Sequence, residues 1–550
     1  MECHVWRCSL QWGHLAMLGF VATYLFAQDL QHFMAPGEGR DAPHCFGLKT
    51  ATSCAVSITD CDGLESLPKP IGKDATLFFD SIDVVVCDKP VTLTVDNGTE
   101  LSVRLTTNSG DIGVSEKASA SGSESGLRLN NVRIVVEGGG RLTVGIGVGP
   151  AEVALAKGGQ QSNMLTLAGT VAQQGSDGGA LEVKQGGAAV FLVPVRFEAN
   201  AVADGSSGGA LHVEGEVRFE QAAHFQGNRC SAGNMHSRND ESCGGAVFIG
   251  RSGKVGFSEF ASFEDNSAGH GGALCNRGKA KFSRRSFFSR NQALGGDGGA
   301  LRAEEEGETT FLRKSTMLNN FATGSGGAVY NAGTTSFETS AVFMDNEAAA
   351  VLVPTVPRSP ALELASAVTQ TVPFAAVDPR GMKGSSHAGG GHLFNRGRLN
   401  IRGDASFRGG LSSTHGGAVY AVSGQDTVLG GITSFEGNRA GGRCQDIFSS
   451  VLGSEVQLTT ITVAPTALLG RNPTAPYSTL TANGSTDVGY AAASTTTSAL
   501  PVASVGEAKK RRRTSHSAVF PAGPGDAVED SRLSRSASGL IRTTPCQPPR

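Results

Sequence analysis

Short apolar stretches separated by glycine-rich turns alternate along most of this chain. From Gly271 the sequence runs Gly-Gly-Ala-Leu-Cys-Asn-Arg-Gly-Lys-Ala-Lys-Phe, typical of a strand, a turn and a second strand. Phe282-Ser-Arg-Arg-Ser-Phe-Phe continues the alternation. The stretches are three to six residues long, which is too short for helices. The pattern therefore predicts an all-β fold made of many short strands.

Two motifs recur in step along the chain. Gly-Gly-Ala followed by an apolar residue, with one Gly-Gly-His-Leu variant, starts at Gly178, Gly208, Gly244, Gly271, Gly298, Gly326, Gly390 and Gly416. The second motif, Phe-x-x-Asn, has degenerate copies at Met317/Asn320 and Phe407/Gly410. The basic interval is about 27 residues, and repeats of this size are typical of solenoids. We therefore predict a right-handed parallel β-helix with three short strands per rung, stacked because one rung cannot bury its own apolar face.

The repeated residue types predict how the interior is filled. The apolar residue after Gly-Gly-Ala should point inward, and the Phe side chains should stack ring on ring along the axis. The Asn of each Phe-x-x-Asn should join an amide ladder that also satisfies turn backbone groups. The predicted ladder comprises Asn200, Asn228, Asn266, Asn291, Asn320, Asn346 and Asn438.

The regular repeat covers only part of the chain. We expect it at 176–450, interrupted by insertions at 229–243 and 347–388, with irregular early rungs at 91–175. Residues 28–90 form a cysteine-containing N-terminal cap, and 451–550 form a low-complexity, disordered tail. Residues 1–27 are typical of a signal peptide, because their apolar run is too short for a membrane span of ~20 residues. No transmembrane span is expected elsewhere.

Composition and cysteine usage refine this picture. Glycine makes up 75 of 550 residues, and the net charge of −3 gives no reason to expect a nucleic-acid partner. Cys230 and Cys243 flank twelve residues, so we predict a disulfide that pins the inserted loop. Candidate disulfide partners in the cap are Cys45, Cys54, Cys61 and Cys87. Asn97 and Asn483 begin N-glycosylation triplets.

The two motifs at this spacing resemble the passenger repeats of chlamydial polymorphic outer membrane proteins, and similar repeats occur in secreted proteins of algae. The resemblance covers about 176–449, half of the chain. It implies a right-handed parallel β-helix displayed outside the cell, with a role in adhesion or surface architecture. Bacterial members end in an outer-membrane β-barrel, whereas the 110 residues after Ala440 are mostly of low complexity. We therefore expect a eukaryotic-type, secreted member that lacks the autotransporter barrel.

The functional expectation follows from what the columns of the repeat contain. The two positions before the ladder Asn do not place carboxylates on neighbouring rungs, as acid–base chemistry or a calcium site would require. We expect a non-catalytic secreted or cell-surface structural or adhesion protein, without cofactor or metal. Its expected partners are extracellular glycans or surface proteins. The alternative is a carbohydrate-active β-helix enzyme, a polysaccharide lyase or epimerase acting on an acidic polysaccharide.

Overall fold

The structure, a computed structural model, describes a defined part of the chain. The described residues are 53–72, 74–79, 84–105, 126–146, 164–203, 205–231, 243–349, 388–422, 427–444, 447–449, 456–463 and 480–482. The signal segment, Cys45, Asn483, most of the 347–388 insertion and nearly all of the tail lie outside them. The chain divides into two compact units, residues 1–285 and 286–550, which are described separately.

Unit 1 begins with long strands and one short helix. These elements are β1 (Ser53–Ile58), α3 (Cys61–Glu65), β2 (Asp74–Phe79), β3 (Val84–Val95), β4 (Glu100–Leu105), β5 (Gly126–Val136), β6 (Arg141–Ile146) and β7 (Met164–Ala168). These strands pair in parallel, as in β1 with β2, β2 with β4 and β3 with β5. Asp60 caps α3 by accepting a hydrogen bond from the Gly63 N–H. Stacked rungs therefore begin well before the first Gly-Gly-Ala motif.

Each regular rung of unit 1 contains four strands. The first strands are β9 (Leu181–Val183), β13 (Leu211–Val213), β17 (Val247–Ile249) and β21 (Leu274–Asn276). The second strands are β10 (Ala188–Phe191), β14 (Glu216–Phe219), β18 (Lys254–Phe257) and β22 (Lys279–Phe282). The third strands are β11 (Val195–Glu198), β15 (Ala223–Gln226) and β19 (Ala261–Glu264). The two-residue fourth strands are β8 (Val171–Ala172), β12 (Ala201–Val202), β16 (Arg229–Cys230) and β20 (Ser267–Ala268).

Unit 2 repeats the same four-strand rung. Its first strands are β25 (Leu301–Ala303), β29 (Val329–Asn331), β33 (Leu393–Asn395), β37 (Val419–Ala421) and β41 (Ile447–Ser449). Its second and third strands are β26 (Glu308–Phe311), β30 (Thr334–Phe337), β34 (Arg398–Ile401), β23 (Ser286–Ser289), β27 (Ser315–Leu318), β31 (Ala341–Met344), β35 (Ala405–Arg408) and the long β38 (Thr427–Glu436). The remaining strands are β24 (Gln292–Ala293), β28 (Phe321–Ala322), β32 (Glu347–Ala348), β36 (Leu411–Ser412), β39 (Arg439–Ala440), β40 (Arg443–Cys444), β42 (Val456–Val463) and β43 (Leu480–Ala482).

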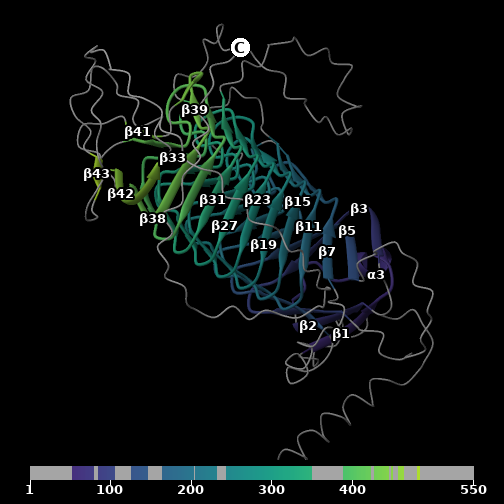
Figure 1. The fold of residues 1–550 in the computed structure, drawn as a ribbon. Helices are drawn as coiled ribbons and strands as arrows, with labels where there is room; N and C mark the ends of the chain where they lie inside the picture. The colour runs from purple at the N-terminus through teal and green to yellow at the C-terminus, as the bar shows by residue number, and fades with distance from the viewer. Residues whose placement is uncertain are drawn as a thin grey trace, which may run out of the picture. The chain divides into compact units, whose positions relative to one another are not determined.

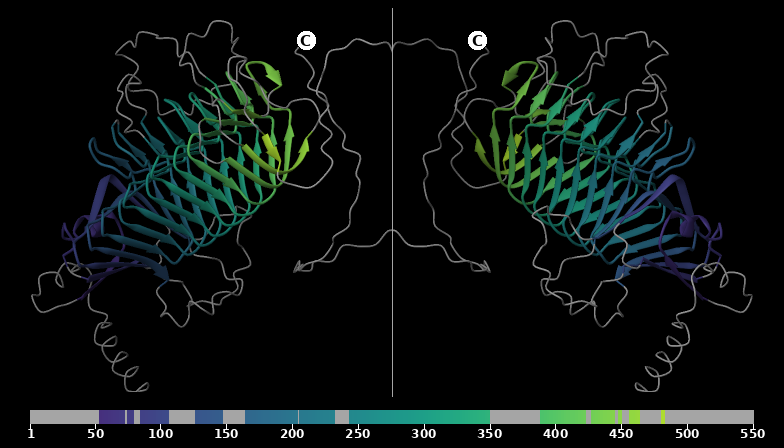
Figure 2. Two further views of the ribbon diagram at one scale, coloured as in Figure 1. Left: turned by 90° about the vertical axis from the view of Figure 1, so that its left-hand side faces the viewer. Right: turned by 90° about the vertical axis from the view of Figure 1, so that its right-hand side faces the viewer.

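The predicted fold class is confirmed in both units: strands of successive rungs pair in parallel and in register. In unit 1, β11, β15 and β19 lie side by side, and in unit 2 so do β23, β27 and β31 (Figure 1). The two side views show the strands of each unit in parallel rows (Figure 2). The sequence predicted three strands per rung. The structure adds a fourth, because the two residues after the ladder Asn are also extended and pair with their neighbours.

Phenylalanine columns fill the interior as predicted. In unit 1, Phe197, Phe225 and Phe263 stack with centroids 4.9 and 4.8 Å apart and nearly parallel rings. In unit 2, Phe311 and Phe337 stack at 4.6 Å in a second column. Adjacent columns meet edge to face, as aromatic quadrupoles prefer. The rung spacing of ~4.8 Å thus sets the stacking distance.

The residue before each ladder position adopts a left-handed backbone conformation. Ala199, Asp265, Arg290, Asn319 and Asp345 have φ between 50° and 56°. Glycine occupies the same position in three other rungs, at Gly227, Gly409 and Gly437. Since Asp and Asn tolerate this conformation better than most residues, their presence here is explained by backbone geometry. The column is therefore a turn feature.

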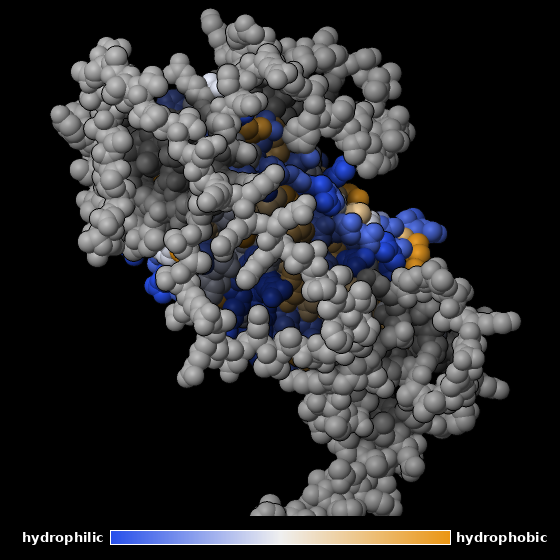
Figure 3. Space-filling view, in the orientation of Figure 1, coloured by the Kyte–Doolittle hydropathy of each residue, from blue (hydrophilic) through white to orange (hydrophobic). Residues whose placement is uncertain are grey.

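Outward surface is mixed in character. Where described residues are visible in the space-filling view, hydrophilic surface predominates, with some apolar spots (Figure 3). Exposed apolar side chains include Val86, Phe260 and Ile432. Among the described residues, no helix has the length and apolar character needed to cross a membrane.

Candidate functional site

The predicted ladder residues of unit 1 form one buried column. The Asn200 Nδ2 and backbone N–H both donate to Asn228 Oδ1, at 3.1 and 3.0 Å. Asn228 donates to Asn266 Oδ1 in the same two ways, each at 3.0 Å. Each Nδ2 also reaches a backbone carbonyl of the preceding rung, as from Asn228 to Phe197. All three side chains are 0 % exposed. The Asn column therefore links successive rungs through both amide ends.

In unit 2 the column contains a histidine. Asn291, Asn320 and Asn346 repeat the amide pattern, with Nδ2–Oδ1 distances of 2.9 Å. The next rung has Gly410 at the ladder position. There the imidazole of His392 bridges the gap, with Nδ1 2.9 Å from Asn346 Nδ2 and Nε2 3.2 Å from Asn438 Oδ1. The Asn346 amide can only donate to Nδ1, so the bonds assign the proton to Nε2.

His392 and Gly410 are complementary departures from the repeat. A Cβ at Gly410 would lie 2.6 Å from His392 Nε2 and 2.2 Å from the Gly417 carbonyl oxygen. His392 is fully buried, and burial lowers the pKa of its imidazole to about 3, against a smaller raising effect of the Asn438 hydrogen bond. The imidazole of His392 is therefore neutral in the folded protein.

The Asn-x-Gly turns contain a second set of buried amides. In unit 2, Asn331 Nδ2 donates to Asn395 Oδ1 at 2.7 Å, and Asn395 Nδ2 donates to Thr427 Oγ1 at 2.7 Å. In unit 1, Asn276 Oδ1 accepts from the Gly278 N–H at 2.9 Å. In unit 2 these turn residues therefore also link successive rungs.

The predicted Cys230–Cys243 disulfide is wrong, because Cys243 bonds to Cys275, with Cα atoms 5.6 Å apart. Cys230 lies in β16 and its buried side chain joins a column with Val202 and Ala268 on the inner side. Cys243 instead lies immediately before the corner at Gly244. There it faces Cys275, which is an outward side chain of the next rung. In the cap, the Cys61–Cys87 disulfide is present and Cys54 is disulfide-bonded.

Tryptic mapping without reduction should distinguish the two pairings. Cleavage places Cys230, Cys243 and Cys275 in three different peptides, 230–238, 239–251 and 255–277. We expect peptide 239–251 to appear linked to 255–277. A linked pair of 230–238 and 239–251 would restore the original prediction.

The outward side chains of the first strands in unit 2 form an aromatic and guanidinium column. Tyr330 and Phe394 stack with centroids 5.1 Å apart and ring planes 4° apart. The Arg302 guanidinium carbon lies 5.6 Å over the Tyr330 ring, and Arg302 Nε is 2.9 Å from Glu304 Oε1. Arg396 Nη1 donates to the Tyr330 hydroxyl at 3.2 Å. Burial, followed by the nearby Asp297 carboxylate, raises the pKa of Tyr330, which keeps the phenol protonated.

The same column in unit 1 has a different composition. His212 tilts against Phe248 with centroids 4.8 Å apart, and the Arg277 guanidinium lies 5.4 Å over that ring. His212 Nδ1 is 3.7 Å from Asp177, which precedes a Gly-Gly corner. The signal for this column in the sequence is the residue two places after the alanine of each Gly-Gly-Ala motif, whereas the functional prediction rested on the two positions before the ladder Asn. Its groups contact one another, which favours a structural role.

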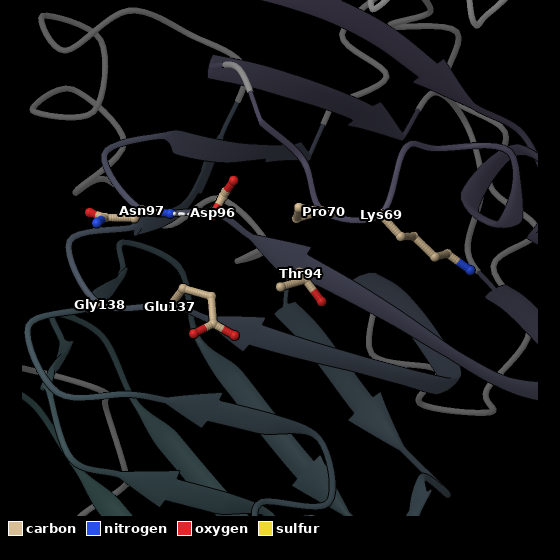
Figure 4. A pocket seen from close by; sticks show the side chains of 7 residues that line it. All are labelled: Lys69, Pro70, Thr94, Asp96, Asn97, Glu137 and Gly138. Carbon is tan, nitrogen blue, oxygen red and sulfur yellow. Dashed lines mark hydrogen bonds between the residues drawn. The ribbon is translucent and has the colours of Figure 1, made fainter.

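A shallow hollow lies at a corner of the early rungs. It is lined by Lys69, Pro70, Thr94, Asp96, Asn97, Glu137 and Gly138 (Figure 4). Glu137 already pairs with Lys184, with 2.7 Å between Oε1 and Nζ. Asn97 lies in a turn at the rim of the hollow and is exposed, as a glycosylation site must be. Glycosylation at Asn97 stays a prediction.

These features define a parallel β-helix protein with stacked, ladder-linked repeats. Residues 314–332, which span β27, β28 and β29, match the family model described as Chlamydia polymorphic membrane protein (Chlamydia_PMP) repeat. The chain thus carries a repeat of this family, as the motif resemblance predicted. No curated protein matches the chain significantly, and no solved structure does.

Proposed function

We propose that this protein is a non-catalytic surface adhesion or scaffold protein that acts outside the cell and binds its partner through outward side chains of the β-helix. The fold and the family match support a structural β-helix protein that carries a polymorphic-membrane-protein repeat. Adhesion, export from the cell and the absence of catalysis go beyond these two observations and are proposed.

The observation that carries the proposal is the contrast between inward and outward positions of the same strands. In β14, β18 and β22 the inward residue near the end of each strand is always Phe, at 219, 257 and 282. The outward residues beside them change from Arg218 to Gly256 to Lys281. Packing constrains the identity of the inward residues, whereas the outward residues are free to vary. This is the pattern expected of a scaffold that presents a binding surface on its outside.

The grouped titratable side chains of unit 2 also favour a structural role. Arg396 is occupied by the Tyr330 hydroxyl and by Glu305, whose Oε1 lies 2.7 Å from Nη2. A phenol with a raised pKa is a poor general base at neutral pH. The cluster therefore supports packing of this column better than it supports proton transfer.

The deciding experiment combines a glycan array with a lyase assay on the full-length secreted protein. We expect binding to a subset of extracellular glycans and no unsaturated products from alginate or pectin. Tyr330→Phe, which keeps the ring stack and removes only the hydroxyl, serves as the matched variant and should leave binding unchanged. Unsaturated products that disappear in Tyr330→Phe would establish the enzyme instead.

A further inference from the structure

The outward face of β14, β18 and β22 in unit 1 gathers basic side chains. Lys254 is in register with Lys279 on the next strand, so their Cα atoms are ~4.8 Å apart. Lys281 points to the same side as Lys279, two residues along the strand and ~6.6 Å away. All three lysines are exposed. Arg284 and Arg285 follow in the next turn, also exposed.

Gly256 leaves a notch in the middle of this face. It is in register with Arg218 on one side and Lys281 on the other, and Lys254 precedes it on the same face of β18. A Cβ built on Gly256 meets nothing within 4 Å. A ligand group can therefore approach the strand backbone here, between cationic side chains on neighbouring strands. We call Lys254, Lys279, Lys281 and Gly256 the lysine face.

Two acidic side chains beside the lysine face pair with arginines, although Glu216 is also in register with Lys254. Glu216 Oε1 lies 2.6 Å from Arg218 Nη2, and Glu259 Oε2 lies 3.8 Å from Arg284 Nε. Each of these two pairs is electrically neutral, so the positive charge of the face comes from Lys254, Lys281 and Arg285. The chain as a whole has a net charge of −3, so this local positive charge runs against the overall balance.

We propose that the lysine face is a binding site for an extended acidic polysaccharide, with one carboxylate or sulfate group seated at Gly256. The proposal rests on the proposed function and names its ligand class. Lysine ammonium groups act as point charges that suit flexible, repeated anions, whereas planar bidentate recognition would favour arginine. The disulfides Cys61–Cys87 and Cys243–Cys275 are typical of oxidising compartments, where such glycans are found. Interleaved aromatic side chains, which nucleic-acid sites use for base stacking, are not part of this face.

The test measures binding of the full-length protein to a heparin oligosaccharide and to polygalacturonate at several salt concentrations. The variant Lys254→Gln/Lys281→Gln removes two charges from the face. Its matched control, Lys69→Gln/Lys89→Gln, removes two exposed charges elsewhere in unit 1. Gly256→Gln fills the notch without changing the net charge. Because affinity for a polyanion depends on the number of cationic side chains that contact it, we expect the lysine variant to bind roughly tenfold or more weakly.

Each outcome has a distinct meaning. Weakened binding in the lysine variant and in Gly256→Gln, with the control unchanged and affinity falling with salt, supports the site. Equal weakening in both double variants overturns the site but leaves the proposed function standing. No binding of either acidic probe overturns this ligand class, and the glycan array then decides the proposed function separately. Duplex DNA that binds as tightly and loses affinity in the same variants overturns the assignment to a glycan.

Discussion

Replacing Asn320 with Leu should lower the free energy of unfolding by about 3 kcal/mol or more. The Asn320 Nδ2 donates to the Phe288 carbonyl at 3.1 Å and to Asn346 Oδ1 at 2.9 Å. Its Oδ1 accepts both the backbone N–H and the Nδ2 of Asn291, at 3.0 and 2.9 Å. Leucine is similar in size, so it removes these bonds without leaving a large cavity. Buried donors and acceptors that lose their partners cost about 1–3 kcal/mol each.

Asn319 offers a control at the adjacent position. It has the same side chain but is exposed, with φ of 53°. Asn319→Gly suits that backbone conformation and should change stability by only a few tenths of a kcal/mol. Urea denaturation of the two variants, with hydrogen exchange of β27 and β31 as a local readout, separates the two roles. Equal stability of Asn320→Leu and Asn319→Gly would show that the ladder contributes nothing beyond volume.

The ladder positions could be predicted from the sequence because they depend on a fixed distance from the Phe columns. Residues that depend on two rungs at once could not. His392 fills the gap at Gly410, eighteen residues later in the same rung, and neither departure from the repeat signals the other. The Cys243–Cys275 pairing likewise depends on a corner residue facing the outward residue of the next rung, whereas spacing alone favoured the nearer Cys230.

The fold class was predictable for a related reason. A period of about 27 residues with strand-length apolar stretches constrains the chain to stacked rungs. The two-residue fourth strands carry no such signal, because Gln292–Ala293 and Phe321–Ala322 share only a small inward residue. The outward column of Tyr330 and Phe394 was missed because its residues differ from rung to rung, as expected where packing does not fix identity.

The second large effect concerns acid. His392 should make the protein lose stability as the pH falls from about 6.5 toward about 3. The unfolded chain takes up a proton on this imidazole below about 6.5, whereas the native state holds it neutral down to about 3. The unfolded state thus binds more protons in this window, so acid favours unfolding by about 1.4 kcal/mol per pH unit. From pH 7.5 to 4.5 the expected loss is roughly 2–3 kcal/mol.

Protonation is resisted mainly because burial removes hydration from the charged imidazole, an effect larger than the hydrogen bonds to the Asn438 side chain and the Arg408 backbone that favour it. A proton on Nδ1 would face the Asn346 Nδ2, which is itself a donor, and Asn346 Oδ1 is occupied by the Asn320 N–H at 2.9 Å. The Phe343 and Phe407 rings, with centroids 6.1 and 6.0 Å away, surround the imidazole with apolar surface. The charged form would therefore lose more in hydration than these hydrogen bonds return.

His392→Gln separates titration from hydrogen bonding. Glutamine reaches about as far, accepts from Asn346 through Oε1 and donates to Asn438 through Nε2, yet it does not titrate. Wild type and His392→Gln should be close in stability at pH 7.5 and diverge as the pH falls, because the contributions of Glu347 and His415, whose pKa values are also shifted by burial, are common to both and cancel. His392→Ala should be destabilised at every pH, since it leaves Asn346 and Asn438 without a bridge. Parallel stability curves for wild type and His392→Gln between pH 7.5 and 4.5 would show that the imidazole titrates normally, and so that it does not occupy the dry gap in the ladder.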